Sequence, residues 1–237
     1  MMRRTGALAL AVVLAGIIVL SACEPAPTPD TYVSIGDSMV AGPGVPEQIV
    51  EAGACLRSTQ NLGHKVEPLI GVSRLVDVSC SGALTRDVLA TQLDAVDART
   101  KVLTITIGYN DIDYSGIVTT CTPVNTCTGG FVHDGRDVIS ERIAAYGPKL
   151  DAVLVEAERR APQALIVVVP YVPLFATGAG CLPSSPLPWD LPYLQAKFAE
   201  LNATMKARAL ANGARYVDAV ANATGHDICS ADRWIEG

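Results

Sequence analysis

Glycines and small polar residues directly follow three apolar runs of the chain, where they could handle negative charge together. Gly36-Asp37-Ser38 closes the first run, Gly82 follows the second, and Asn110 follows the third. A glycine exposes its backbone N–H and an asparagine offers a side-chain NH₂ group, so both can donate hydrogen bonds to an oxyanion. A helix starting at Ser38 would add further amides and its positive dipole. The pattern predicts a site that stabilises a developing negative charge.

Five short runs rich in β-branched and aliphatic residues have the composition of strands. They are Tyr32–Ile35, Leu75–Ser79, Lys101–Ile107, Ala164–Val169 and Arg215–Val220. Runs of this apolarity suit a parallel sheet that is covered on both faces.

Two longer stretches carry apolar residues at helical spacing. In the first, the apolar stripe starts at Ile139 and continues beyond a break expected at Gly147-Pro148, because proline interrupts helical hydrogen bonding. The second stretch covers about Leu191–Ala211, and Gly213 lies just past its end. The first stretch is expected to pack on the sheet.

The alternation of strands and helices predicts the fold class. A chain of 237 residues is long enough for one domain with a sizeable core. Strand and helix patterns that alternate indicate an α/β fold, a three-layer sandwich around a central, mainly parallel five-stranded sheet with right-handed crossovers. Ligands of such sheets bind beyond the carboxyl ends of the strands, where Ser38, Gly82 and Asn110 are expected.

The residues at these strand ends resemble a known family, the SGNH or GDSL hydrolases. The matching blocks are Gly36-Asp37-Ser38-Met39, Val78-Ser79-Cys80-Ser81-Gly82, Thr106-Ile107-Gly108-Tyr109-Asn110-Asp111 and Gly225-His226-Asp227-Ile228-Cys229. The sequence is most similar to the secreted bacterial esterases and lipases of that family, over about Tyr32 to Gly237. The resemblance implies the flavodoxin-like SGNH fold. It assigns Ser38 as nucleophile, and the Ser38 amide, Gly82 and Asn110 as oxyanion-hole donors.

The same resemblance implies a reaction. Ser38 would attack the carbonyl carbon of a carboxylic ester, and water would then hydrolyse the acyl-enzyme, with no metal or organic cofactor. Short acyl esters, phospholipids and acetyl groups on cell-wall sugars all suit the family, so the substrate stays open. The alternative is an inactive lipoprotein of the same fold that binds an acyl or glycan ligand without turnover.

One family block is absent from this sequence. The family supplies its base from a late Asp-x-x-His, and no histidine here stands three residues after an aspartate. A serine without an adjacent base is a poor nucleophile. Three explanations stay open: the sequence is a fragment whose C-terminal end is truncated, the protein is a natural inactive form, or His226 serves as substitute base.

The N-terminus has the pattern of an export signal. Arg3 and Arg4 precede the apolar run Ala7–Leu20, which at 1.5 Å per residue spans about 21 Å and is short for a transmembrane helix. Leu20-Ser21-Ala22-Cys23 resembles a bacterial lipobox, which implies lipidation of Cys23. We therefore expect a signal peptide at residues 1–22, a proline-rich tether at 23–30 and the hydrolase-like domain at 31–237, either lipid-anchored on the outer side of the membrane or secreted.

Six cysteines besides Cys23 form an even set, which in an exported protein predicts disulfides. They are Cys55, Cys80, Cys121, Cys127, Cys181 and Cys229. The residues alone allow fifteen connectivities, with a turn-prone segment favouring local pairing of Cys121 with Cys127. The family resemblance implies the pairs Cys55–Cys80, Cys121–Cys127 and Cys181–Cys229. No Cys-x-x-Cys or histidine spacing suggests zinc, so no metal site is expected.

The charge balance limits the partners. The chain has 18 Lys and Arg against 24 Asp and Glu, for a net charge of −6. Nucleic-acid binding requires a basic face that neutralises phosphates, so no nucleic-acid partner is expected. We expect a monomer whose partners are a small-molecule or lipid ester and, through its lipid anchor, the membrane.

Overall fold

The computed structural model of the chain describes residues 30–121, 126–172, 189–227 and 229–235. Its central sheet has five parallel strands in the order β2-β1-β3-β6-β7. The strands are β1 (Thr31–Gly36), β2 (Arg74–Asp77), β3 (Thr100–Thr106), β6 (Leu165–Val168) and β7 (Arg215–Tyr216). Numbered within this sheet alone, the order is 2-1-3-4-5, the flavodoxin-like order. The predicted α/β fold class is confirmed.

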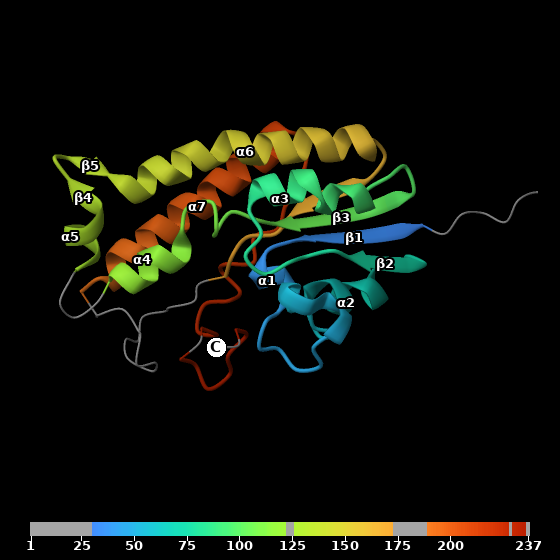
Figure 1. Cartoon of the computed structure of the whole chain (residues 1–237), viewed down its shortest axis with the longest axis horizontal. Coiled ribbons are helices and arrows are strands. Elements are labelled where there is room, and N and C mark those ends of the chain that lie inside the picture. Colours follow the sequence, from blue (N-terminus) through green and yellow to red (C-terminus); the bar gives the residue numbers. More distant parts are fainter. Residues whose placement is uncertain (1–29, 122–125, 173–188, 228, 236–237) are drawn as a thin grey trace, which may run out of the picture.

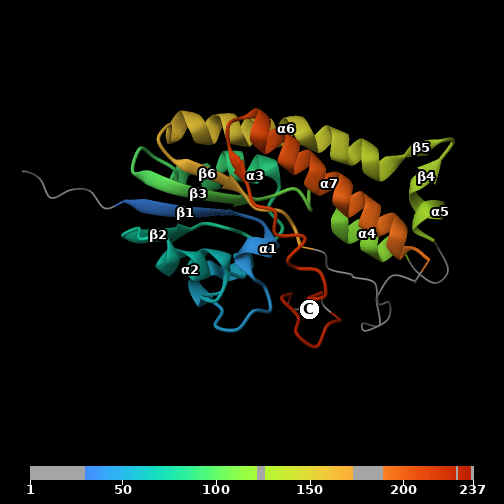
Figure 2. The ribbon, with the colours of Figure 1, turned by 180° about the vertical axis from the view of Figure 1, so that it is seen from behind.

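Helices lie on both sides of this sheet (Figures 1 and 2). One side carries α3 (Thr85–Ala90), α6 (Val138–Arg160) and α7 (Leu191–Ala211), and the other carries α1 (Ser38–Ala41) and α2 (Leu62–Val66). This division follows from right-handed crossovers, because the chain moves from β1 toward one edge and then back toward the other. The result is the expected three-layer sandwich.

Smaller elements complete the described chain. Three 3₁₀ helices cover Val50–Cys55, Glu67–Leu69 and Gln92–Ala95. The short helices α4 (Tyr114–Thr120) and α5 (Cys127–Phe131) and the hairpin of β4 (Val132–His133) and β5 (Arg136–Asp137) gather near the start of α6 (Figure 1).

Alternation along β1 separates the two packing layers. Val33 and Ile35 are fully buried in the main hydrophobic cluster, which also contains the inner faces of α6 and α7. Ser34 points to the other side, where Gly63 of α2 packs so closely that an added Cβ would lie 3.0 Å from the Ser34 Cβ. The period-two pattern of the sequence thus defines which face each side chain serves.

The last strand is shorter than the run Arg215–Val220 predicted. It ends at Tyr216 because its neighbour β6 ends at Val168, so the following residues have no partner strand. The Val217 amide donates the last bond between the two, 3.2 Å to the Val168 carbonyl oxygen. The chain then continues through turns rather than as sheet.

The break predicted at Gly147-Pro148 is wrong, because α6 runs through both residues without interruption. Proline removes one helical hydrogen bond, yet the buried stripe on either side stays on one face and packs against the sheet and α7. Gly147 leaves room for the Arg208 side chain of α7, whose Nε would lie 3.0 Å from an added Cβ. Tertiary packing outweighs the local interruption.

In the described ranges no helix is both long and apolar enough to cross a bilayer. The predicted signal peptide and Cys23 lie outside the described residues.

Candidate active site

Ser38 occupies the turn between β1 and α1. Asp37 caps the helix, its Oδ1 accepting a hydrogen bond of 3.0 Å from the Met39 amide, and Ser38 is the first helical residue. The helix has four residues, so its dipole is small and individual amides matter more than the dipole expected from the sequence. The side chain of Ser38 is partly exposed, as a nucleophile must be.

The turn is held rigidly because Gly36 is enclosed. Its φ is 154°, and an added Cβ would lie 2.3 Å from the Thr106 carbonyl oxygen and 2.6 Å from Val40 Cγ2. Gln92, which is buried, brackets the Gly36 backbone with two bonds, one of 2.8 Å from the Gly36 amide to Oε1 and one of 2.9 Å from Nε2 to the Gly36 carbonyl oxygen. Only glycine fits here, and the path of the chain into Ser38 is fixed.

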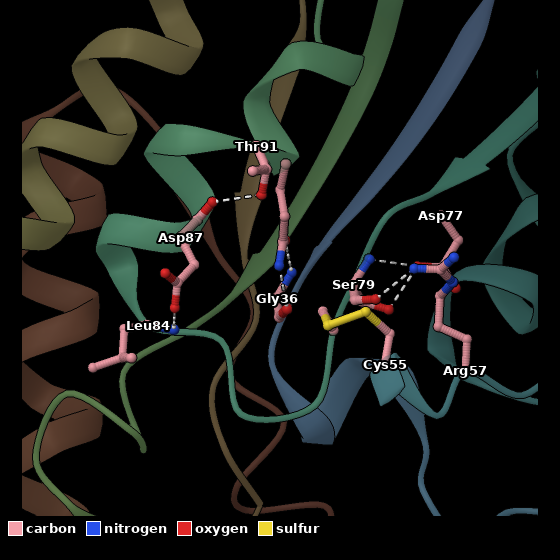
Figure 3. Close-up of a disulfide and its surroundings, with 10 residues drawn as sticks. Gly36, Cys55, Arg57, Asp77, Ser79, Leu84, Asp87 and Thr91 are labelled. Atoms are coloured by element: carbon pink, nitrogen blue, oxygen red, sulfur yellow. Dashed lines mark hydrogen bonds between the residues drawn. A yellow bond between two sulfur atoms is a disulfide. The ribbon is translucent and has the colours of Figure 1, made fainter. Parts of the chain in front are cut away.

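Gly82 follows the neighbouring β2, and its segment is tied to the turn that carries Ser38. The Cys80 amide donates to the Gly36 carbonyl oxygen at 3.0 Å, and the Ser81 amide donates to the Cys55 carbonyl oxygen at 3.0 Å. The disulfide between Cys55 and Cys80 joins the Cys55 segment to the Gly82 turn a second time (Figure 3). Gly82 itself has a positive φ of 81°, which a residue with a side chain rarely adopts.

Asn110 follows β3 and reaches toward the Gly82 turn. Its Nδ2 donates a hydrogen bond of 2.8 Å to the carbonyl oxygen of Ala83, the residue after Gly82. The next residue, Asp111, anchors this loop by accepting bonds from the Thr85 amide at 2.9 Å and the Thr85 hydroxyl at 2.7 Å. One hydrogen of the Asn110 NH₂ group is therefore used for positioning, and the second stays available for a ligand.

The structure thus brings the three predicted strand ends together at one edge of the sheet. In the described part of the chain, no hydrogen bond acceptor is found for the amide of Ser38 or of Gly82. Two unpaired amides beside one unused side-chain N–H form a set of donors that an oxyanion could satisfy.

Asp37 is fully buried behind Ser38. Burial raises the pKa of its carboxyl group to about 7, although hydrogen bonds from the Tyr171 hydroxyl and the Met39 amide act in the opposite direction. The Tyr171 hydroxyl donates to Asp37 Oδ2. Tyr171 was not predicted from the sequence, although it follows the fourth strand at the same edge. That position is the signal that could have found it.

His226 lies in the turns that follow β7. Its Nδ1 is 2.7 Å from the carbonyl oxygen of Asp232 and its ring stacks on Trp234 at 4.1 Å between centroids. Since a carbonyl oxygen only accepts, Nδ1 carries the proton and Nε2 keeps the lone pair that a base needs. Within the described residues no hydrogen bond joins Ser38 to His226 or to another histidine.

A cavity of about 530 Å³ opens beside the loop that carries Asn110. Its wall includes Tyr109, Ile117, Leu194, Phe198 and Tyr216, whereas Ser38, Gly82 and Asn110 do not line it. Tyr109 directly precedes Asn110, and its buried hydroxyl has no hydrogen-bond partner in the described part of the chain. The lining of the cavity is predominantly apolar, with a smaller polar part that includes Lys197, Lys206 and Asp218.

The predicted disulfides are found where the chain is described. Cys55 pairs with Cys80 and Cys121 pairs with Cys127. Cys229 is disulfide-bonded, but its predicted partner Cys181 lies outside the described residues, so that pairing remains a prediction. No cluster of three or more histidine, cysteine or carboxylate side chains that could hold a metal ion occurs in the described ranges.

Residues 34–237 match the family model described as the GDSL-like lipase/acylhydrolase family. Two curated proteins of Streptomyces coelicolor (strain ATCC BAA-471 / A3(2) / M145) are similar to the chain. Lipase 2 is 35% identical, over 90% of this chain and 78% of its own. Lipase 1 is 30% identical, over 96% of this chain and 83% of its own.

Two solved structures share the fold over most of their length. Phospholipase A1 from Streptomyces albidoflavus NA297 superposes with a TM-score of 0.79 at 27% identity, covering 89% of this chain and 88% of that one. The extracellular lipase from Streptomyces rimosus superposes with a TM-score of 0.73 at 29% identity, covering 88% of each chain.

Proposed function

The chain belongs to the GDSL-like lipase/acylhydrolase family and is a carboxylic ester hydrolase, and on this premise we propose that Ser38 is its nucleophile. The Ser38 Oγ attacks the ester carbonyl carbon, the hydroxyl proton passes to a base, and the carbonyl oxygen becomes an oxyanion. The alcohol then leaves with a proton, and water hydrolyses the acyl-enzyme to regenerate Ser38.

The observation that carries this proposal is the convergence of unused donors at one sheet edge. The amides of Ser38 and Gly82 and the second N–H of Asn110 have no acceptor in the described part of the chain. Donors fixed before the reaction stabilise the oxyanion without reorganising. In many acyl-transfer enzymes this stabilisation accelerates the reaction more than any other single effect.

An apolar acyl group is the substrate moiety that the neighbouring cavity suits. Side chains such as Ile117, Leu194 and Phe198 offer no hydrogen bonds to a sugar, whereas an aliphatic chain would bury apolar surface against them. We therefore favour lipid-like esters over acetyl groups on cell-wall sugars. Hydrolysis of p-nitrophenyl esters of increasing acyl length tests this, with a preference for acetate as the contrary result.

No hydrogen bond of the described residues assigns the base of this mechanism, and His226 is the candidate to be tested. His226 has Nε2 free and follows the carboxyl end of β7. A triad that lacks its base still retains rate enhancement from the oxyanion hole and from binding. Hydrolysis above the rate in buffer is therefore expected whether or not His226 accepts the proton.

The test of the nucleophile compares Ser38→Ala with Ser81→Ala in hydrolysis of p-nitrophenyl butyrate. Ser81 lies in the Gly82 turn and its hydroxyl has no hydrogen-bond partner among the described residues, so its loss is a matched control. We expect Ser38→Ala to lose the acyl-enzyme route and to fall to the residual rate given by the oxyanion donors and binding alone. Ser81→Ala should keep the rate within about threefold, as expected for a hydroxyl that makes no hydrogen bond. Equal rates for wild type and Ser38→Ala would remove Ser38 from the reaction.

A second candidate function is ligand binding without turnover. The absence of a hydrogen bond between Ser38 and any histidine of the described residues favours it. Binding of a fluorescent fatty acid that survives Ser38→Ala, with no hydrolysis by the wild type, would support this alternative.

The N-terminus supports a proposal about location. The export signal and the lipobox-like Leu20-Ser21-Ala22-Cys23 suggest a lipoprotein on the outer side of the membrane. The test is membrane fractionation of the full chain against Cys23→Ala. Wild type in the membrane fraction and the variant in the medium is the expected result. The same fraction for both would argue for plain secretion.

A further inference from the structure

One tyrosine hydroxyl touches both halves of the proposed oxyanion site. Tyr171 follows β6, is fully buried, and donates its hydroxyl hydrogen to Asp37 Oδ2. The same oxygen accepts a hydrogen bond of 2.9 Å from the amide of Tyr109. Asp37 immediately precedes Ser38 and Tyr109 immediately precedes Asn110. The hydroxyl therefore connects the turn that carries the nucleophile to the loop that carries the oxyanion donor.

We propose that Tyr171 is a positioning residue, whose hydroxyl sets the distance between the Ser38 amide and the Asn110 side chain. This inference rests on the proposed function, because it concerns the same oxyanion site. Tyr171 would touch neither the ester nor the reacting atoms, and would act through the residues before Ser38 and Asn110.

The Tyr171 hydroxyl can set this distance because the rest of the residue is itself immobilised. Its backbone is clamped by Asn202 of α7, which accepts from the Tyr171 amide at 3.2 Å and donates to the Tyr171 carbonyl oxygen at 2.9 Å. Its ring stacks on that of Tyr109 with 3.5 Å between centroids. Because backbone and ring hold the hydroxyl in place, it determines where Asp37 and the Tyr109 amide lie. A mobile hydroxyl would instead adapt to these partners.

Small displacements matter at such a site. Oxyanion donors act at about 2.7–3.1 Å from the oxygen they serve, and a misplacement of about 1 Å can lower a rate about 100-fold. Without the Tyr171 hydroxyl, the Tyr109 amide and the Asp37 carboxyl group each lose a buried partner. The two loops then keep their backbone link from the Asp37 amide to the Thr106 carbonyl oxygen, at 3.1 Å, and their own anchors, Gln92 for Gly36 and Thr85 for Asp111, but lose the contact closest to Ser38 and Asn110.

The structure offers a matched control in Tyr146. It is also fully buried, and its hydroxyl donates at 2.7 Å to the carbonyl oxygen of Ile107 at the end of β3. This bond holds α6 to the strand but reaches neither Asp37 nor the Tyr109 amide. Tyr146→Phe therefore removes a comparable buried hydroxyl without cutting the connection between the two halves of the site.

The experiment compares Tyr171→Phe and Tyr146→Phe in the otherwise unchanged chain. For p-nitrophenyl butyrate we expect Tyr171→Phe to lower kcat by about 10- to 100-fold with little change in KM, since the loss concerns the transition state. Tyr146→Phe loses one buried hydrogen bond where Tyr171→Phe loses two, and it should change kcat by less than about threefold. Equal effects of the two variants on kcat would overturn the proposal.

A second measurement separates this inference from the proposed function. NMR of the resting protein should show the side-chain N–H resonances of Asn110 and the Ser38 amide shifted in Tyr171→Phe but not in Tyr146→Phe. If the wild type shows no Ser38-dependent hydrolysis, the proposed function fails, and these resonances still decide the positioning role. Unmoved resonances in Tyr171→Phe would refute it.

A further variant covers the case in which Tyr171→Phe does not fold. Asn202→Ala releases the backbone of Tyr171 and leaves its hydroxyl in place. We expect the same Asn110 and Ser38 resonances to shift, with kcat lowered less than in Tyr171→Phe. Unchanged resonances and an unchanged kcat would count against the proposal.

Discussion

The sheet edge around Ser38 and the loop around His226 are held in different ways. The bonds at the edge join residues far apart in the sequence, separated by 134 positions for Asp37 with Tyr171 and 56 for Gly36 with Gln92. The ring of His226 contacts Asp232, six positions away, and Trp234 in the same loop.

This difference teaches what each region can do. A long-range bond fixes a side chain relative to the rest of the molecule, because its partner belongs to another element. A local bond fixes the internal shape of a loop and leaves the placement of that loop to other contacts. Preorganised stabilisation of a transition state needs the first kind of support. At the sheet edge, long-range bonds support the segment of every proposed oxyanion donor. Among the described residues, the ring of His226 has only local bonds.

The buried carboxyl group of Asp37 gives the largest expected effect. Its folded-state pKa of about 7 lies above the ordinary value of 3.8. Its contribution to stability is therefore complete below about pH 4 and is lost as the pH rises through 7. By linkage the free energy of unfolding falls by up to about 4 kcal/mol across this range. Urea unfolding of wild type and Asp37→Asn at pH 5 and pH 8.5 measures this fall in the free energy of unfolding. The variant should lack the part of the fall that comes from Asp37. Parallel pH dependences would show that Asp37 titrates normally.

Removal of the Asn110 side chain tests the edge through activity. Asn110→Ala should lower kcat by about 10²- to 10³-fold, the usual cost of one oxyanion donor. Asn212→Ala is a suitable control, since this residue donates at 2.8 Å to Asp151 and lies away from Ser38 on α7's C-terminal end. Steady-state kinetics of both variants give the two kcat values to be compared. A rate for Asn110→Ala equal to that of the control would remove Asn110 from the oxyanion hole.

The two disulfides allow a comparison of a long and a short covalent loop. Cys55–Cys80 closes 25 positions and Cys121–Cys127 closes 6. Chain entropy predicts losses of roughly 3.5 and roughly 2 kcal/mol on their removal as paired alanines. The longer bridge also anchors Cys80, which lies two residues before Gly82. Its loss should therefore lower kcat as well. Denaturant unfolding and hydrolysis rates of the two double variants measure this. Equal kcat values for the two double variants would show that the Cys55–Cys80 disulfide does not support the site.

The sequence indicated those parts of the edge that have a local signature. Ser38, Gly82 and Asn110 stand in short blocks directly after strands, so their arrangement followed from the parallel sheet once the strands were recognised. Gln92 has no such signature, and Tyr171 has only its position after the fourth strand. Their roles come from tertiary partners 56 and 134 positions away, which a local pattern does not contain.

Pro148 shows a different reason for a wrong prediction, because here a valid local rule is outweighed by tertiary packing. Proline does remove a helical hydrogen bond, yet α6 continues through it because the apolar residues on both sides bury against the sheet and α7. The predicted length of β7 was wrong for a related reason, because its ladder of hydrogen bonds ends where the neighbouring β6 ends. Local preference decided where elements begin, and packing decided how far they continue.

The smallest expected effect concerns His226 and bears most directly on the difference between the two regions. Since the ring is held by contacts within its own loop, nothing in the described residues aims Nε2 at Ser38. We therefore expect His226→Ala to lower kcat by less than about threefold, far below the cost of an oxyanion donor. His133→Ala, in the hairpin beside α5, serves as control. A loss for His226→Ala near that of Ser38→Ala would reverse this conclusion, because it would make His226 the base and the loop an equal partner of the sheet edge.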